Sequence, residues 1–252
     1  MSYFRAENLS LHFGGLKAVD SVNFALEKGE ILSIIGPNGA GKSSIFNLIS
    51  RLYNPTSGRL FFEDQEITQE PPYSIAKLGI ARTFQNIELF ENASVLNNLL
   101  VGRHRHCTSS LWQEILYMPS VRRDEKIHRH KVEQVIEFLD LEPYRDRVIS
   151  GLPYGVRKVV ELARALCTEP KLILLDEPSS GLNVEETTDM SFWIRDMQSE
   201  LGITVLMVEH DMSLVSRVSD RVIALNYGKV LAMGQPAEVQ SHPDVVAAYL
   251  GA

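Results

Sequence analysis

Residues 36–43 have the types and spacing needed to bind a chain of phosphates. They read G-P-N-G-A-G-K-S, follow an apolar run at 31–35 and lead into a helical pattern. A strand, a glycine-rich loop and a helix in this order direct backbone N–H groups and a helix N-terminus toward an anion. Lys42 would reach the β- and γ-phosphates, and the Ser43 hydroxyl would bind Mg²⁺. The pattern predicts a nucleoside triphosphate site lined by Gly36, Pro37, Asn38, Gly39, Ala40, Gly41, Lys42, Ser43 and Ser44.

Two adjacent carboxylates, Asp176 and Glu177, follow a second apolar run at 172–175. Such a run is typical of a buried strand, and the end of a buried parallel strand lies at the ligand-binding edge of its sheet. Asp176 would hold Mg²⁺, and Glu177 would polarise an attacking water molecule. Beside a phosphate-binding loop, the pair indicates hydrolysis of the bound triphosphate.

Short apolar runs predict the strands that position these groups. The alternating runs near the N-terminus favour a small antiparallel β subdomain. The nearly continuous apolar runs favour strands of a parallel sheet that is covered on both faces, as in an α/β core. The expected strands lie at 4–13, 21–26, 31–35, 59–62, 66–67, 172–175, 204–208 and 222–225.

The pattern changes in the middle of the chain, where helical spacing replaces strand-like runs, for example at 132–139. We therefore expect a single domain over 1–252, with a nucleotide-binding core at about 1–88 and 162–252. The inserted helical subdomain is expected at about 89–161.

Composition narrows the classes of partner. The net charge is −7, which does not favour nucleic acid as a partner. The two cysteines, Cys107 and Cys167, do not form a disulfide framework and fit a reducing cytosol. The sequence shows neither a signal peptide nor an apolar run as long as a membrane span. If the protein works at a membrane, we expect another chain to supply the membrane part.

The order of the motifs resembles that of the ABC-type ATPases, the nucleotide-binding subunits of ATP-binding-cassette transporters. Gln85 in A-R-T-F-Q, the segment S-G-L-N at 180–183, His210 in E-H-D and Phe13 all match family motifs in order. The resemblance implies that Gln85 contacts Mg²⁺ and water, that His210 contacts the γ-phosphate, and that Phe13 stacks on adenine. It also implies that 180–183 crosses a dimer interface. ATP and Mg²⁺ are the implied ligands.

The family's signature segment is altered in this chain. L-P-Y-G-V at 152–156 stands where many members have L-S-G-G-Q. The glycine still allows close approach to a phosphate, and the following helix aims its positive end there. The missing serine hydroxyl removes a hydrogen bond worth about 1–3 kcal/mol to a charged, desolvated phosphate. The resemblance implies a working variant in which this segment completes the site of a second ATPase subunit, through Pro153, Tyr154, Gly155 and Val156.

Three segments resemble the ATPases of branched-chain (hydrophobic) amino-acid importers: the L-x-Y-G signature, G-I-A-R-T-F-Q at 79–85 and A-Y-L-G at 248–251. The ATPases of urea or amide importers belong to the same lineage. The resemblance implies a second ABC ATPase subunit, identical or paralogous, together with transmembrane permease subunits and, indirectly, an external solute-binding protein. The implied location is the cytoplasmic face of the membrane.

Two alternatives belong to other classes. One is a non-transport ABC ATPase that acts on nucleic acid or ribosomes, although the chain has neither a duplicate cassette nor heptads. The other is a module in which nucleotide drives assembly without hydrolysis, and Glu177 argues against it.

Basic residues concentrate at 103–107 and 122–131. His104, His106 and Cys107 lack a fourth ligand at a suitable spacing, so we expect a solvated helical face rather than a metal site. The remaining alternative is contact with acidic lipid headgroups or with a partner loop. We also expect Glu209 and Asp211 to be solvated residues beside His210.

Overall fold

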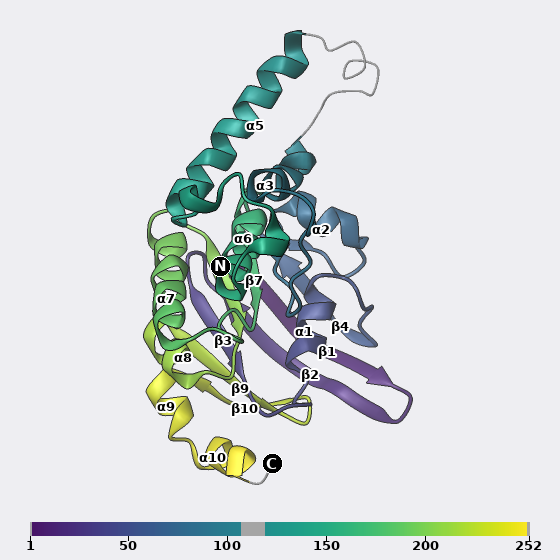
Figure 1. Ribbon diagram of the computed structural model, residues 1–252. Coiled ribbons are helices and arrows are strands. Elements are labelled where there is room, and N and C mark those ends of the chain that lie inside the picture. Colours follow the sequence, from purple (N-terminus) through teal and green to yellow (C-terminus); the bar gives the residue numbers. More distant parts are fainter. Residues whose placement is uncertain (1, 107–118, 251–252) are drawn as a thin grey trace. The chain divides into compact units, whose positions relative to one another are not determined.

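The computed structural model describes residues 2–106 and 119–250, which form two compact units (Figure 1). The first unit contains the described residues of Met1–Gln85 and Lys171–Ala252. The second contains those of Asn86–Pro170.

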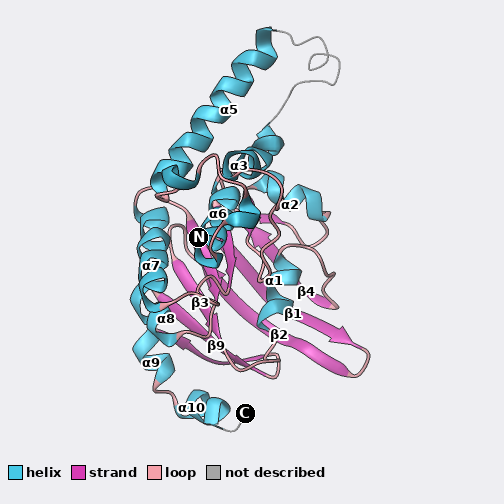
Figure 2. Cartoon of the chain, viewed as in Figure 1, coloured by secondary structure: helices cyan, strands magenta, loops and turns pink. Residues whose placement is uncertain are grey.

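A six-stranded sheet forms the centre of the first unit. Its order is β10–β9–β3–β8–β7–β6, and every pair is parallel except β10–β9. Figure 2 draws the strands of the chain in magenta and the helices in cyan. All residues of β3, β7 and β8 are buried, which explains their continuous apolar sequences. The prediction of a parallel α/β core is confirmed. The strands are β3 (Ile31–Ile35), β6 (Ile80–Arg82), β7 (Leu172–Asp176), β8 (Thr204–Val208), β9 (Arg221–Asn226) and β10 (Lys229–Gly234).

Two strands of this sheet were not predicted from the sequence. Strand β6 has three residues, too few to show a period. Strand β10 is a partly exposed edge strand that turns back antiparallel to β9 through Tyr227 and Gly228, which have φ angles of 46° and 76°. Its register shifts between Val230 and Ala232, so alternation is broken there.

The second sheet of this unit is antiparallel, in the order β2–β1–β4–β5. Strand β2 begins at Leu16, five residues before the expected start at Ser21. Ser21 has a φ of 55°, and the β1–β2 register shifts between Leu9 and Leu11, so the alternation of the first half is hidden. The strands are β1 (Phe4–Phe13), β2 (Leu16–Leu26), β4 (Ser57–Phe62) and β5 (Gln65–Glu66).

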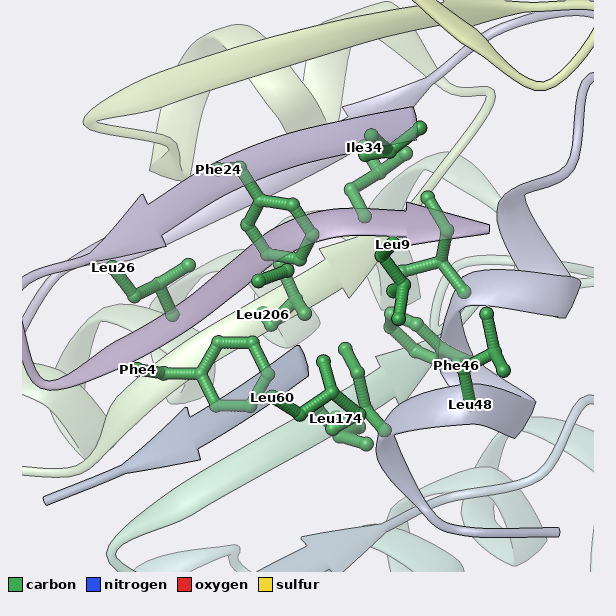
Figure 3. Packing of buried hydrophobic residues seen from close by; sticks show 14 of the residues in the cluster. Phe4, Leu9, Phe24, Leu26, Ile34, Phe46, Leu48, Leu60, Leu174 and Leu206 are labelled. Carbon is green, nitrogen blue, oxygen red and sulfur yellow. The ribbon is translucent and has the colours of Figure 1, made fainter. Parts of the chain in front are cut away.

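The core of the first unit lies between its two sheets, with one helix packed among them. Figure 3 shows Phe4 and Leu60 from the antiparallel sheet, Phe46 from α1 (Lys42–Ile49), and Leu174 and Leu206 from the six-stranded sheet. Because α1 is anchored on both sheets, its N-terminal end has a fixed position. The remaining helices are α2 (Pro72–Leu78), α7 (Val184–Ser199), α8 (Met212–Val218), α9 (Pro236–Gln240) and α10 (Pro243–Leu250).

The second unit is helical, as predicted, and its described part contains no strand. Helix α3 packs against α5 and α6, and Val95, Leu99, Val132, Ile136 and Val160 are buried. The elements are α3 (Val95–Gly102), η1 (Arg103–His106), α5 (Pro119–Phe138), η2 (Glu142–Tyr144), η3 (Ile149–Gly151) and α6 (Tyr154–Leu166). No described helix of the chain combines the length with the apolar composition that crossing a bilayer requires.

The core predicts the effect of a large-to-small substitution. Leu206 is fully buried in β8, so Leu206→Ala should lower the free energy of unfolding by about 2–5 kcal/mol. Leu201 is half exposed and serves as a matched control, for which Leu→Ala should change stability by less than about 1 kcal/mol. Denaturant unfolding of both variants measures the difference. Equal losses would contradict the placement of the core.

Candidate nucleotide-binding site

The loop predicted to bind phosphate joins β3 to α1. Gly41 precedes α1 with a φ of 106°, and a Cβ there would lie 2.4 Å from the carbonyl oxygen of Ala18. A Cβ on Gly36 would lie 2.2 Å from the carbonyl oxygen of Leu225. Among the described residues, no side chain caps the start of α1. The loop therefore leaves helix N–H groups for an anion, and its shape requires glycine at two positions.

Lys42 is already ordered within this loop. Its side chain is buried, and Nζ donates hydrogen bonds to the carbonyl oxygens of Gly36 at 2.6 Å and Pro37 at 3.0 Å. Burial lowers the pKa of Lys42, and the nearby carboxylates of Glu177 and Asp176 partly oppose that shift. The ammonium group is thus held at the loop beside the two acidic residues.

The predicted catalytic residues of the first unit lie together. Glu177 follows β7 with a φ of 51°, an unusual conformation for a residue other than glycine, and its N–H donates to the Val208 carbonyl oxygen at 2.9 Å. The amide Nε2 of Gln85 donates to Glu177 Oε2 at 3.0 Å. Nδ1 of His210 lies 3.9 Å from the same oxygen. The Glu177 carboxylate thus accepts a hydrogen bond from the Gln85 amide and lies close to the His210 imidazole.

The residues proposed to hold Mg²⁺ differ in burial. Ser43 is exposed on the first turn of α1, whereas Asp176 is buried at the end of β7. A hydroxyl on a phosphate-binding helix and a carboxylate at the adjoining sheet edge are oxygen donors of the kind that Mg²⁺ accepts when phosphates complete its shell. The donor set therefore fits Mg²⁺ bound together with a triphosphate.

Phe13 lies at the end of β1 with 49% of its surface exposed. Its ring packs edge-on against Tyr53, with the centroids 5.5 Å apart. An exposed aromatic face is what stacking on a base requires. The sequence did not identify Tyr53, because a single aromatic residue in a turn carries no motif.

The prediction of solvated residues beside His210 was wrong for Glu209. Glu209 is fully buried and accepts hydrogen bonds from the Ser179 N–H and hydroxyl at 2.9 and 2.7 Å, and from the N–H groups of His210 and Asp211 at 2.9 and 3.2 Å. Asp211 caps α8 by accepting from the Ser213 N–H at 2.8 Å. Both acids hold backbone in place around His210, Glu209 from a buried position and Asp211 from a partly exposed one.

The altered signature segment belongs to the second unit. Pro153 is the residue before α6, which begins at Tyr154, so the expected helix start is confirmed. Tyr154 is 41% exposed, Gly155 is buried and Val156 is intermediate in exposure. Among the described residues, no side chain caps this helix end either. Its first turn therefore offers backbone N–H groups beside an exposed aromatic ring.

The prediction of a solvated face was wrong for Arg103 of the basic stretch. Arg103 is buried, and Nη1 donates to the Cys167 carbonyl oxygen at 2.9 Å and lies 3.4 Å from Glu169 Oε2. The end of α6 needs such a donor for its free carbonyl groups.

Burial raises the pKa of the Cys167 thiol to about 12. Cys107 lies outside the described residues, within which no three His, Cys, Asp or Glu side chains are grouped so that they could hold a metal ion.

A family model described as "ABC transporter" matches residues 19–180, which include the loop at 36–43 and the two adjacent carboxylates at the end of β7. The chain belongs to the ABC transporter family. A second model, described as "Branched-chain amino acid ATP-binding cassette transporter", matches residues 229–252. As an ABC-type ATP-binding protein, the chain is an ATPase with the P-loop α/β fold that the sequence predicts.

Individual relatives match almost the whole chain. The high-affinity branched-chain amino acid transport ATP-binding protein BraF of Pseudomonas aeruginosa is 40% identical over 243 residues, covering 96% of this chain and 95% of the relative. LivG of Escherichia coli, of the same description, has the same identity and coverage. A crystal structure of an ABC transporter's ATP-binding cassette in its ADP conformation superposes with a TM-score of 0.87 at 34% identity, with full coverage of both chains.

The buried Glu209 predicts a measurable structural effect. An amide nitrogen in Glu209→Gln would face N–H donors that the carboxylate now satisfies, so the variant should lose about 1–3 kcal/mol of unfolding free energy. ATP hydrolysis should also fall, because the single amide oxygen can serve either the Ser179 donors or the N–H groups of His210 and Asp211, but not both. Denaturant unfolding and ATPase rates test both effects, with the exposed Glu200→Gln as the matched control. If Glu209→Gln is as stable as the wild type, these hydrogen bonds do not contribute to the free energy of unfolding.

Proposed function

We propose that this ATPase subunit powers the import of branched-chain amino acids through a membrane complex. The match of residues 229–252 to the branched-chain family model carries the proposal, because this C-terminal segment lies outside the general ATPase match at 19–180. The 40% identity to BraF and LivG over nearly the whole chain supports the same substrate class.

We infer the roles of the site residues from their contacts. The loop N–H groups and Lys42 bind the β- and γ-phosphates of ATP, and Phe13 carries the adenine. Glu177 accepts a proton from the attacking water. The hydrogen bond from Gln85 holds the Glu177 carboxylate in orientation. His210, beside the same carboxylate, donates to the γ-phosphate. Mg²⁺ would be held by Ser43, Asp176 and, once ATP is bound, Gln85, and it would supply positive charge against the phosphate oxygens.

A second ATPase subunit completes each site in this proposal. The start of α6, from Pro153 to Val156, directs N–H groups to the γ-phosphate bound by the partner subunit, and residues 180–183 cross the interface. The partner is a second copy or a paralogue. Transmembrane permease subunits hold the pair at the cytoplasmic face of the membrane, and an external solute-binding protein delivers the amino acid. Closure on ATP and reopening after hydrolysis drive the permeases.

The catalytic assignment predicts a distinct phenotype for Glu177→Gln. ATP binding should persist while turnover falls by a factor of about 10²–10⁴, because the base is lost but the phosphate contacts remain. The variant should also accumulate a closed dimer with ATP. Lys42→Ala should instead weaken nucleotide binding itself. ATPase rate, nucleotide affinity and sedimentation are measured together, and wild-type turnover of Glu177→Gln would remove this residue from the base role.

The transport assignment predicts coupled uptake. With permease subunits and solute-binding protein in liposomes, the wild-type chain should drive ATP-dependent accumulation of leucine, isoleucine and valine. The Glu177→Gln variant should assemble but not transport. Accumulation of urea or amides instead would reassign the cargo within the lineage. Stimulation of the ATPase by nucleic acid alone, with strong salt dependence, would contradict a transport role.

A further inference from the structure

Arg82 connects three elements of the first unit around the catalytic edge of its sheet. It is the last residue of β6, and its Nη2 donates to Asp176 Oδ2 at the end of β7, at 2.8 Å. Its Nη1 donates to Asn47 Oδ1 and Ser50 Oγ, both at 2.8 Å, at the far end of α1. One guanidinium group thus joins the strand before Gln85, the carboxylate proposed to hold Mg²⁺, and the helix that follows the phosphate loop.

The pair between Arg82 and Asp176 is withdrawn from water. The Arg82 side chain is 9% exposed and the Asp176 side chain is 5% exposed. The guanidinium carbon lies 5.5 Å from the centre of the Phe46 ring and 5.1 Å from that of Phe84, and Nε is buried without an acceptor among the described residues. A buried carboxylate is strongly destabilising once its partner is removed. Lys42, the other nearby cation, donates to the loop carbonyls.

The backbone around the pair is fixed as well. The Thr83 N–H donates to the Leu174 carbonyl oxygen at 3.0 Å, and the Asp176 N–H donates to Thr83 Oγ1 at 3.3 Å. Asp176 is therefore held through both its main chain and its side chain by two consecutive residues of one segment. A lysine at position 82 could not reproduce this arrangement, because its single ammonium lacks the planar fork that reaches two partners in different directions.

We propose that Arg82 is the counter-ion of Asp176 whenever Mg²⁺ is absent, and that it delays Mg²⁺ binding until a triphosphate is present. This inference rests on the proposed role of Asp176 as a Mg²⁺ ligand. Arg82 occupies one carboxylate oxygen and places a positive charge beside the metal position, which opposes a dication arriving alone. The negative charge of the triphosphate offsets that opposition, so metal and nucleotide enter together. Arg82 acts through Asp176 and is a positioning residue.

Thermal unfolding without nucleotide tests the proposal. The full-length wild-type chain and Arg82→Met are compared in EDTA and in millimolar Mg²⁺ at equal ionic strength. The wild-type Tm should not respond to Mg²⁺. In EDTA, Arg82→Met should lose on the order of 10 °C, because Asp176 is left buried and unpaired. Mg²⁺ should restore most of that loss by taking the place of the guanidinium group.

Two control variants isolate the metal effect. Arg221 pairs with the buried Glu30 in the same unit, so Arg221→Met should lower the Tm equally in EDTA and Mg²⁺. The double variant Arg82→Met/Asp176→Asn lacks both charges. It should be more stable than Arg82→Met in EDTA and should not respond to Mg²⁺.

The outcomes separate this inference from the proposed function. A loss in Arg82→Met that is the same in EDTA and Mg²⁺, as in Arg221→Met, would overturn the counter-ion role while leaving the catalytic assignment intact. Mg²⁺ stabilisation that persists in the double variant would remove Asp176 as a metal ligand and overturn both. If Arg82→Met does not fold, Arg82→Gln replaces it; this change also removes the charge, so a Mg²⁺-dependent rise in Tm is again expected. Its absence would overturn the inference.

Discussion

The burial of charge at the carboxyl edge of the six-stranded sheet constrains much of the first unit. Lys42, Asp176 and Glu209 are all nearly excluded from solvent, and each would be costly there without partners. Loop carbonyls hold the lysine, Arg82 holds the aspartate, and four donors hold the glutamate. The backbone around the site is fixed in one conformation because any other would leave one of these buried charges without its partner.

Parallel pairing brings these charges to one edge. Strands β6, β7, β8 and β3 end in the same direction, so the residues after each strand meet although they are far apart in sequence. Gln85 reaches Glu177 in this way, and His210 lies near the same carboxylate. Helix α1 is fixed between the two sheets and places Lys42 and Ser43 in its first turn.

Local sequence was sufficient to predict the phosphate loop, the strands β3, β7 and β8, and the start of α6. Each of these has either a continuous apolar run or a glycine or proline that restricts the backbone to one kind of turn. Local sequence was insufficient where contacts with residues distant in the sequence decide whether a side chain is buried. Glu209 and Arg103 look like surface charges, and only their distant partners explain their burial. Arg82 stood within a recognised motif, yet its role depends on β6, a strand too short to predict.

The contacts of Lys42 have a consequence for how nucleotide binding is driven. Its ammonium has already exchanged water for the carbonyl oxygens of Gly36 and Pro37. Because two of the three N–H donors of that ammonium are already bonded, an arriving phosphate has less water to strip from it, and it does not have to freeze a long side chain that was moving freely. The loss of lysine rotamer entropy belongs to folding rather than to association. Binding at this loop should accordingly be a recognition of preorganised charge, with much of the ordering completed before ATP arrives.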